Sequence, residues 1–349
     1  MAQLQGAFST LPPELFLNVL DQLVGTRDGQ QPVAYGPSNT ITKALRALTL
    51  VSRNIYTIAT RYLYTHCLYV DNCTNYARLR RTLSLSLGYH PQALKYGQAG
   101  RNEKLFAKAD ALRYTASAFI SPTKTNKDDS GTTMVRLPQI IDLCSVIGPT
   151  LKRLILDLQP VYTPASEVER VKPYTSENNI FLNMPNLEEL VVSFDVVEYF
   201  PFPPFGLKRL AITVQEMQGS QLDFCFSTSS LQILVFLRPP ELASTDIDRM
   251  FAAYKGASLD VILVDVNSNH RTPRGTRSWT DNDKVRIWEA DVATSFYGDD
   301  NNLILCDNWI WTHAVDGTLW TQSKRRMASW VEVQRRLAGP VHQIISVSH

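Results

Sequence analysis

The sequence predicts a mixed α/β (α+β) fold: an N-terminal helical module, an irregular solenoid of short parallel strands and a β-rich C-terminal cap. Three observations predict it. Apolar residues repeat at helical spacing near the N-terminus, a Leu-x-x-Leu-x-Leu type of motif recurs from the middle of the chain onward, and apolar and polar residues alternate near the C-terminus. With 349 residues, the chain is long enough for more than one domain. We place the three parts at residues 9–70, 71–300 and 301–349.

The first part opens with a predicted helix that begins at Leu11-Pro12-Pro13-Glu14. Prolines fit a first helical turn because its N–H groups lack partners, and Glu14 faces the positive end of the helix dipole. The helix ends at Gly25. Its apolar residues follow one another at intervals of three and four and form one stripe; they include Leu15, Val19, Leu20 and Leu23.

A second helix is predicted over residues 43–64, after a polar, aperiodic connection at 24–41 and before a short strand at 68–70. Its apolar residues also have helical spacing. They are Leu45, Leu48, Val51, Ile55, Ile58, Ala59, Tyr62 and Leu63.

Three segments of this region together resemble the F-box motif of fungal F-box proteins. They are Leu11-Pro12-Pro13-Glu14-Leu15, Leu48-Thr49-Leu50-Val51-Ser52-Arg53 and Arg61-Tyr62-Leu63-Tyr64. In that family the helices bind a Skp-type adaptor, which joins a cullin–RING ubiquitin ligase. The resemblance implies helix-in-groove docking through apolar anchors: Leu11, Pro12, Leu15, Val19, Leu20, Leu48, Val51 and Ile55.

The connection at 24–41 is longer than the family's usual one, which puts the docking geometry in doubt. There is also a second interpretation of the two stripes, because an amphipathic helix shows only that something covers it. On that interpretation the helices pack on the rest of the chain as an N-terminal cap.

The middle part carries five copies of one apolar motif. They are Leu151-x-x-Leu154-x-Leu156, Leu187-x-x-Leu190-x-Val192, Leu207-x-x-Leu210-x-Ile212, Leu231-x-x-Leu234-x-Phe236 and Leu259-x-x-Ile262-x-Val264. Because one strand cannot cover its own apolar face, we expect the copies to stack in parallel. The pattern is similar to a degenerate leucine-rich repeat. The asparagine of a regular repeat is present only as Asn267.

The last part is predicted as a hairpin followed by a short helix. Alternation over 303–311 predicts the first strand, Asp316-Gly317 is a turn signal, and Leu319-Trp320 begins the return strand. Val331–Leu337 is predicted as the helix. Such a cap covers the last apolar edge of a solenoid.

Composition predicts an intracellular chain. The five cysteines show no CxxC spacing and indicate reduced thiols, no apolar run is long enough to span a bilayer, and no signal peptide precedes Leu11. We expect the cytosol or the nucleus and no membrane partner. Residues 1–127 hold 15 Lys and Arg against 6 Asp and Glu, but these cations fall at helical spacing, which is typical of solvated helix faces rather than of nucleic-acid binding.

No local motif indicates catalysis. GxSxG, HExxH, P-loop and GxGxxG patterns are absent, and the six histidines are scattered, so we expect no enzyme activity, cofactor or metal. Arg271, Arg274 and Arg277 lie close together in one loop. Clustered arginines bind carboxylates or phosphates, so this loop is a hypothesis for target binding, against the alternative of a solvated basic loop.

These observations predict a substrate-recognition adaptor of an SCF-type ligase. The F-box is expected to bind the Skp-type adaptor and through it a cullin, and the solenoid to bind an unknown target protein for ubiquitin-dependent degradation. The alternatives are a repeat-based interaction scaffold with no ligase connection, or an enzyme whose site is built from solenoid insertions.

Overall fold

The computed structural model describes residues 12–25, 31–86, 106, 108–122, 135, 137–158, 179–213, 219–237, 250–264, 282–290, 294–295 and 304–326. The α-helices are α1 (Pro13–Val24), α2 (Thr40–Leu48), α3 (Arg53–His66), α4 (Cys73–Ser86), α7 (Leu137–Ile147), α9 (Phe194–Tyr199), α10 (Gly219–Phe226) and α12 (Cys306–Val315). Short 3-10 helices are η2 (Ala111–Tyr114), η3 (Gly148–Thr150), η5 (Ile180–Asn183) and η6 (Leu319–Thr321).

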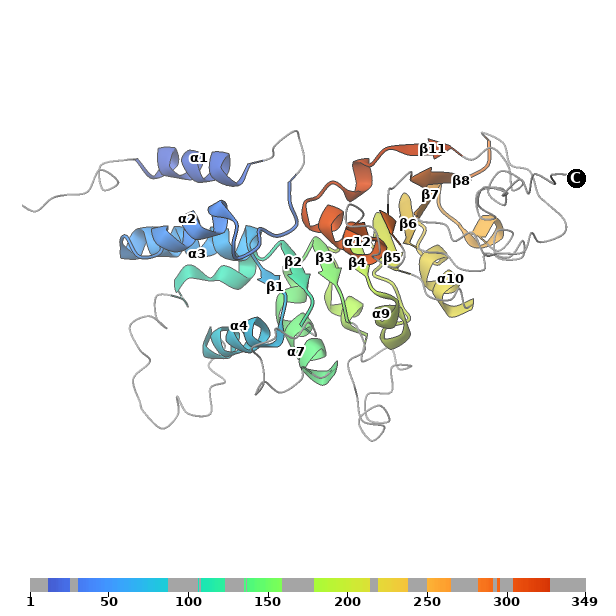
Figure 1. The fold of residues 1–349 in the computed structure, drawn as a ribbon. Helices are drawn as coiled ribbons and strands as arrows, with labels where there is room; N and C mark the ends of the chain where they lie inside the picture. Colours follow the sequence, from blue (N-terminus) through green and yellow to red (C-terminus); the bar gives the residue numbers. More distant parts are fainter. Residues whose placement is uncertain are drawn as a thin grey trace, which may run out of the picture.

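One sheet runs through most of the described chain (Figure 1). Its strands lie in sequence order: β1 (Tyr69–Val70), β2 (Ser117–Ile120), β3 (Arg153–Leu156), β4 (Glu189–Val192), β5 (Arg209–Thr213), β6 (Ile233–Leu237), β7 (Leu259–Val264), β8 (Val285–Ala290) and β11 (Lys324–Arg326). Strands β1 to β8 pair in parallel, and β11 pairs antiparallel with β8. A separate parallel pair joins β9 (Thr294–Ser295) to β10 (Ile304–Leu305).

The five motif copies form the adjacent strands β3 to β7. Four of them are in matching register, with Leu154 opposite Leu190, Leu190 opposite Leu210 and Leu210 opposite Leu234. The fifth is shifted by one residue, because Leu234 pairs with Val261 rather than with the expected Ile262. Since side chains alternate between the two faces of a strand, this shift moves Ile262 to the opposite face.

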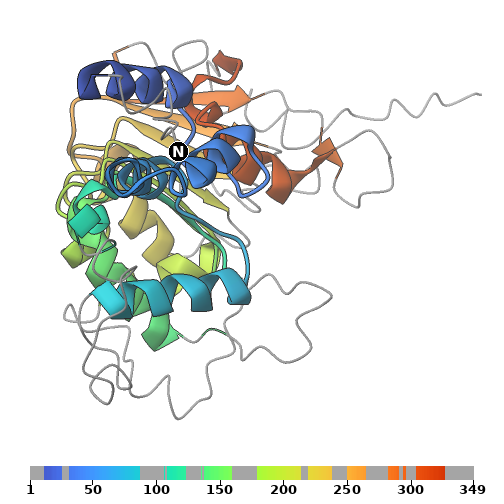
Figure 2. The same ribbon diagram turned by 90° about the vertical axis from the view of Figure 1, so that its left-hand side faces the viewer.

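Both faces of the sheet are buried. Alternate residues such as Leu154 and Leu190 face an apolar cluster that includes α4, α7, α9 and α10. The residues between them, such as Ile155 and Val191, face a second cluster with Trp309, Ile310 and other residues of α12. Figure 2 shows α12 on the opposite side of the strands from α4 and α7.

The predicted fold class is therefore wrong. A solenoid of this kind presents an extended concave surface, whereas these strands form a single sheet with apolar clusters on both faces, which is an α/β arrangement. The motif Leu-x-x-Leu-x-Leu describes the residues on only one face of each strand. Ile155, Val191 and Val235 lie on the other face and make each strand a near-continuous apolar run, which is typical of strands that are buried on both faces.

The β-rich C-terminal cap is also wrong. Residues 306–315 form helix α12, and the predicted return strand at Leu319 is the 3-10 helix η6. Apolar residues at 309 and 311 suit an alternating strand, but buried Ile310 and Ala314 continue a helical stripe. Gly317, with φ of +74°, follows the helix, where glycine adopts this conformation without a steric cost. The helix expected at 331–337 lies outside the described residues.

The described residues of the N-terminal region form three helices, where the sequence predicted two. The predicted helix 43–64 is divided into α2 and α3 at residues 49–52. Ser52 has extended backbone angles, and its hydroxyl accepts a hydrogen bond from the N–H of Ile55, so it is the N-cap of α3. The short strand at 68–70 is present as β1.

Candidate functional site

Helices α1, α2 and α3, which we call the helical module, have their own apolar core. Phe16, Leu20 and Val24 of α1 are buried against Tyr35 and Leu45. Half-buried residues of α2 and α3 pack around this core, including Leu48, Ile55, Ile58, Tyr62 and Leu63. Helix α1 lies beside α2 and α3 at one end of the molecule (Figure 1). The hydroxyl of Tyr62 donates a hydrogen bond to Asp21, which holds α1 against α3.

A second set of apolar residues on α1 is left in solvent. Leu15 is 51% exposed and Val19 is 56% exposed. They are four residues apart and therefore share one side of the helix, away from the inward stripe of Phe16, Leu20 and Val24. Leu17 is 38% exposed on another side. The helix therefore has more apolar surface than the module itself uses.

The turn between α2 and α3 adds two more exposed apolar residues. Leu50 is 87% exposed and Val51 is 52% exposed. The turn is fixed at both ends, because Thr49 donates from its hydroxyl to the carbonyl of Arg46 and Ser52 caps α3. Leu15, Val19, Leu50 and Val51, which we call the outer apolar set, thus lie on ordered backbone. Single exposed leucines are common, whereas exposed apolar residues that lie side by side are typical of interaction surfaces. Leu15 and Val19 share one side of α1, and Leu50 and Val51 are neighbours in the turn.

The predicted anchors divide into three groups. Pro12, Leu15, Val19 and Val51 are exposed. Leu20 is buried in the module core with 1% of its side chain exposed, and Leu48 and Ile55 are half-buried around that core. Leu11 lies outside the described residues. The sequence reasoning missed Leu50, whose position between the two helices was hidden by treating 43–64 as one helix.

The predicted loop 24–41 has a structural role that the sequence did not show. Its described end, the linking segment at residues 31–35, runs between the module and the sheet. Val33 and Ala34 are buried in the α12 cluster, and Tyr35 is buried in the module core. The N–H of Val33 donates to the carbonyl of Val315 at 2.8 Å, and the N–H of Tyr35 donates to that of His66 at 2.8 Å.

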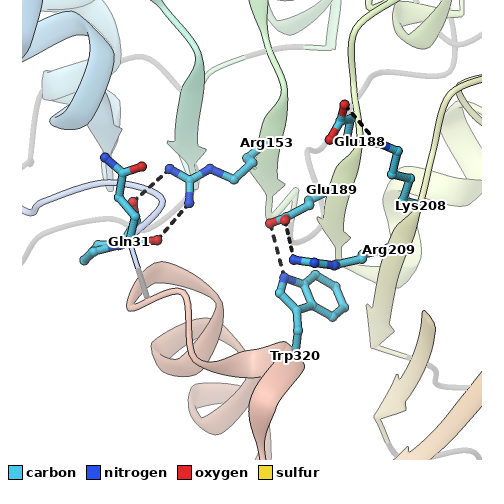
Figure 3. A network of polar contacts seen from close by, with 8 residues as sticks. Gln31, Arg153, Glu188, Glu189, Lys208, Arg209 and Trp320 are labelled. Carbon is cyan, nitrogen blue, oxygen red and sulfur yellow. Dashed lines mark hydrogen bonds and ion pairs between the residues drawn. The ribbon is translucent and has the colours of Figure 1, made fainter. Parts of the chain in front are cut away.

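Arg153 of β3 fixes the same segment from the sheet side (Figure 3). Its guanidinium donates to the carbonyls of Gln31 at 2.8 Å and Pro32 at 3.0 Å. The side-chain amide of Gln31 in turn donates to Nδ1 of His66 at 3.1 Å. Burial, helped by the charge of Arg153, lowers the pKa of His66 to about 4. This histidine is therefore neutral at physiological pH, as its role as acceptor requires.

Charged residues at the start of the strands form cross-strand pairs (Figure 3). Glu189 accepts from Arg209 at 2.6 Å and from the indole N–H of Trp320 at 3.2 Å. Glu188 pairs with Lys208 at 3.1 Å. These carboxylates are occupied in holding strands and the C-terminal segment together, so they are structural rather than an acid/base pair.

The sheet body also carries exposed apolar residues. Leu182 is 49% exposed, Phe202 is 46% exposed and Phe205 is 89% exposed, all in segments that precede β4 or β5. The predicted target-binding residues Arg271, Arg274 and Arg277 lie outside the described residues. Among the described residues, no group of three or more His, Cys, Asp or Glu side chains is arranged to hold a metal ion.

The fold and this surface define an α/β protein whose N-terminal three-helix module presents apolar residues beyond those it buries. No family model matches the chain, and neither the curated proteins nor the solved structures contain a match to it. The F-box resemblance therefore rests on the residues of this chain. Within the described part of the chain, no helix has the length and apolar character needed to cross a membrane.

Proposed function

We propose that the chain is a substrate-recognition adaptor of an SCF-type cullin–RING ubiquitin ligase, in which the helical module binds a Skp-type adaptor. The observation that carries the proposal is the outer apolar set. Leu15, Val19, Leu50 and Val51 remain in solvent although the module has completed its own core with other residues. A partner that covers them gains roughly 25 cal/mol for each Å² of apolar surface removed from water.

The sequence order of these residues supports the same function. The exposed residues of α1 directly follow the Leu-Pro-Pro-Glu opening, and Leu50 and Val51 belong to the Leu-Val-Ser-Arg segment that resembles the family. On the cap interpretation these side chains would be buried against the sheet body. They are instead exposed, which favours an external partner.

The sheet body is proposed to hold the target protein. Its two sheet faces are covered, and we place the binding surface on the segments between strands and helices, where Leu182, Phe202 and Phe205 are exposed. The body supplies proximity, because holding a target beside the ligase raises the effective concentration of its lysines. Nothing in this role needs a catalytic residue in the chain.

A calorimetric titration of the full chain with a Skp-type adaptor tests the proposal. The double variant Leu15→Ser/Val19→Ser is expected to weaken binding by about two orders of magnitude, because each buried leucine or valine contributes roughly 1.5–3 kcal/mol. The matched control Leu182→Ser/Phe205→Ser removes exposed apolar residues from the sheet body instead and should bind like the wild type. No binding of the wild-type chain, or equal loss in both variants, would contradict the proposal.

A further inference from the structure

A cavity of about 270 Å³ lies where the helical module meets the edge of the sheet. Residues of α2 and α3 line one side, and residues of β1 and α4 line the other. Its position between parts that are distant in the sequence means that a molecule bound there would touch the module and the body together. The F-box proposal does not involve this cavity, and the inference below is independent of it.

The cavity is positively charged. Arg46 of α2 and Arg78 of α4 line it from opposite elements, and none of the described residues that line it is Asp or Glu. Arg78 makes a long hydrogen bond of 3.4 Å to the amide oxygen of Asn75, and it has no ion pair among the described residues. The nearest carboxylate along this chain of contacts is that of Asp71, which accepts from the amide nitrogen of Asn75 at 2.8 Å. Both arginines are exposed on the solvent side. Two arginines that line one cavity favour an anionic group as its ligand.

The lining of the cavity combines polar and apolar residues in similar measure. Leu68 and Leu79 are buried residues that line it, and Leu63 is half-buried. Thr42 and Asn75 are polar residues of the lining; the hydroxyl of Thr42 donates to the carbonyl of Tyr35, and the amide of Asn75 donates to Asp71.

We propose that this cavity binds a small organic anion, a molecule with one phosphate or carboxylate group attached to a compact apolar body. The anionic group lies between Arg46 and Arg78, and the apolar body contacts Leu63, Leu68 and Leu79. The cavity volume is slightly below the range of about 300–1,000 Å³ that is usual for drug-sized ligands, which limits the body to about one ring. Because such a ligand bridges α2 and α4, it stabilises the junction of module and body.

Three probes test the charge requirement on the purified full chain. Phenyl phosphate and benzoate carry the two candidate anionic groups on the same ring, and benzyl alcohol is the neutral counterpart. Thermal unfolding measures binding as a concentration-dependent rise of the midpoint. The two anions separate a phosphate site from a carboxylate site, and benzyl alcohol should leave the midpoint unchanged.

Cys67 reports where the probe binds, because it is one of the residues that line the cavity. Burial raises the pKa of this thiol, so alkylation is followed at mildly alkaline pH with quantification of the Cys67 peptide by mass spectrometry. Phenyl phosphate or benzoate should slow alkylation of Cys67 at least threefold at saturation. Alkylation of Cys67 at the same rate with and without an anion that raises the midpoint would place binding elsewhere and overturn the proposal.

Two charge variants complete the test. Arg46→Gln/Arg78→Gln should weaken anion binding at least tenfold, the factor that about 1.4 kcal/mol from a charge-assisted hydrogen bond corresponds to. Lys43→Gln/Arg81→Gln removes the same charge from exposed positions on α2 and α4 that do not line the cavity, and should bind like the wild type. Circular dichroism verifies that both variants fold. Equal weakening in both variants, binding of benzyl alcohol as tight as that of the anions, or no midpoint shift with either anion would overturn the proposal.

Discussion

The central strands of the sheet body and helix α1 of the helical module differ in how far their apolar residues are buried. In the body, residues of the central strands are buried on both faces, by α7, α9 and α10 on one side and by α12 on the other. In the module, α1 buries Phe16 and Leu20 but leaves Leu15 and Val19 in solvent. The central strands are therefore covered on both faces by the chain itself, whereas α1 keeps apolar surface that suits a partner.

The largest expected effect is on the completed core of the body. Trp309 is 5% exposed in the cluster between α12 and the sheet. Trp309→Ala should reduce the free energy of unfolding by roughly 3–5 kcal/mol, because it leaves a large cavity. Urea denaturation measures the change, and Phe205→Ala, at a residue that is 89% exposed, is the control and should change it by less than about 0.5 kcal/mol. A small effect of Trp309→Ala would show that α12 does not complete the core.

Two leucines of one helix test the comparison inside the module. Leu20→Ala should destabilise the protein by roughly 2–4 kcal/mol, since its side chain is 1% exposed in the module core. Leu15→Ala, five residues earlier on the same helix and 51% exposed, should change the stability by less than about 0.5 kcal/mol. Thermal unfolding of the pair measures both. Equal destabilisation would mean that Leu15 is also part of the core and would remove the basis for a docking surface.

Acid should weaken the connection between module and body through His66. The pKa of His66 falls from 6.5 to about 4 on folding. The unfolded chain therefore binds the proton first, so this stability is complete above the unfolded pKa and is lost as the pH falls from 6.5 towards 4. The loss amounts to at most about 3 kcal/mol.

The variant His66→Gln isolates this contribution from that of the carboxylates, which titrate in the same range. The difference in unfolding free energy between wild type and variant should shrink as the pH falls through this window, and urea denaturation at several pH values measures it. A difference that does not change with pH would show that His66 is not protonated on unfolding.

A smaller effect is expected where the linking segment meets the end of α12. A Cβ atom on Gly317 would lie 2.4 Å from the carbonyl oxygen of Gln31, and φ there is +74°. Gly317→Ala should therefore destabilise the protein by about 1–2 kcal/mol through backbone strain and the close contact. Gly36→Ala is the control, because its nearest neighbours are side-chain atoms of Tyr69 at 3.9 Å. Equal thermal midpoints for the two variants would show that the segment does not pack on Gly317.

The sequence predicted the local helices and strands better than it predicted which segments pack against them. The helical start at Pro13 and the parallel order of the strands that begin near residues 153, 189, 209 and 233 follow from spacing, turn residues and alternation, which are properties of neighbouring residues. What covers the second face of the strands depends on α12, more than a hundred residues away from β3. Apolar periodicity shows that a face is buried but not by which segment, so an open surface was predicted where a covered one exists.

The candidate surface could be predicted only in part, because apolar spacing does not show which residues of a helix face inward. A stripe of Leu15, Val19 and Leu20 looks uniform in sequence, yet Leu20 faces inward while the other two face outward. The division depends on how α1 is rotated against α3, which Asp21 and Tyr62 help to fix. The structural role of the linking segment could not be predicted, because its hydrogen bonds are made with Arg153 and Val315, which are distant in the sequence.

Site-specific photo-cross-linking to a Skp-type adaptor tests the central claim most directly. A photoreactive amino acid is placed in the full chain at position 15, at position 51 or at position 182, all exposed in the free protein. The account predicts cross-linking to the adaptor from positions 15 and 51 and none from position 182. Cross-linking from position 182 alone, or from none of the three while the adaptor is bound, would contradict it.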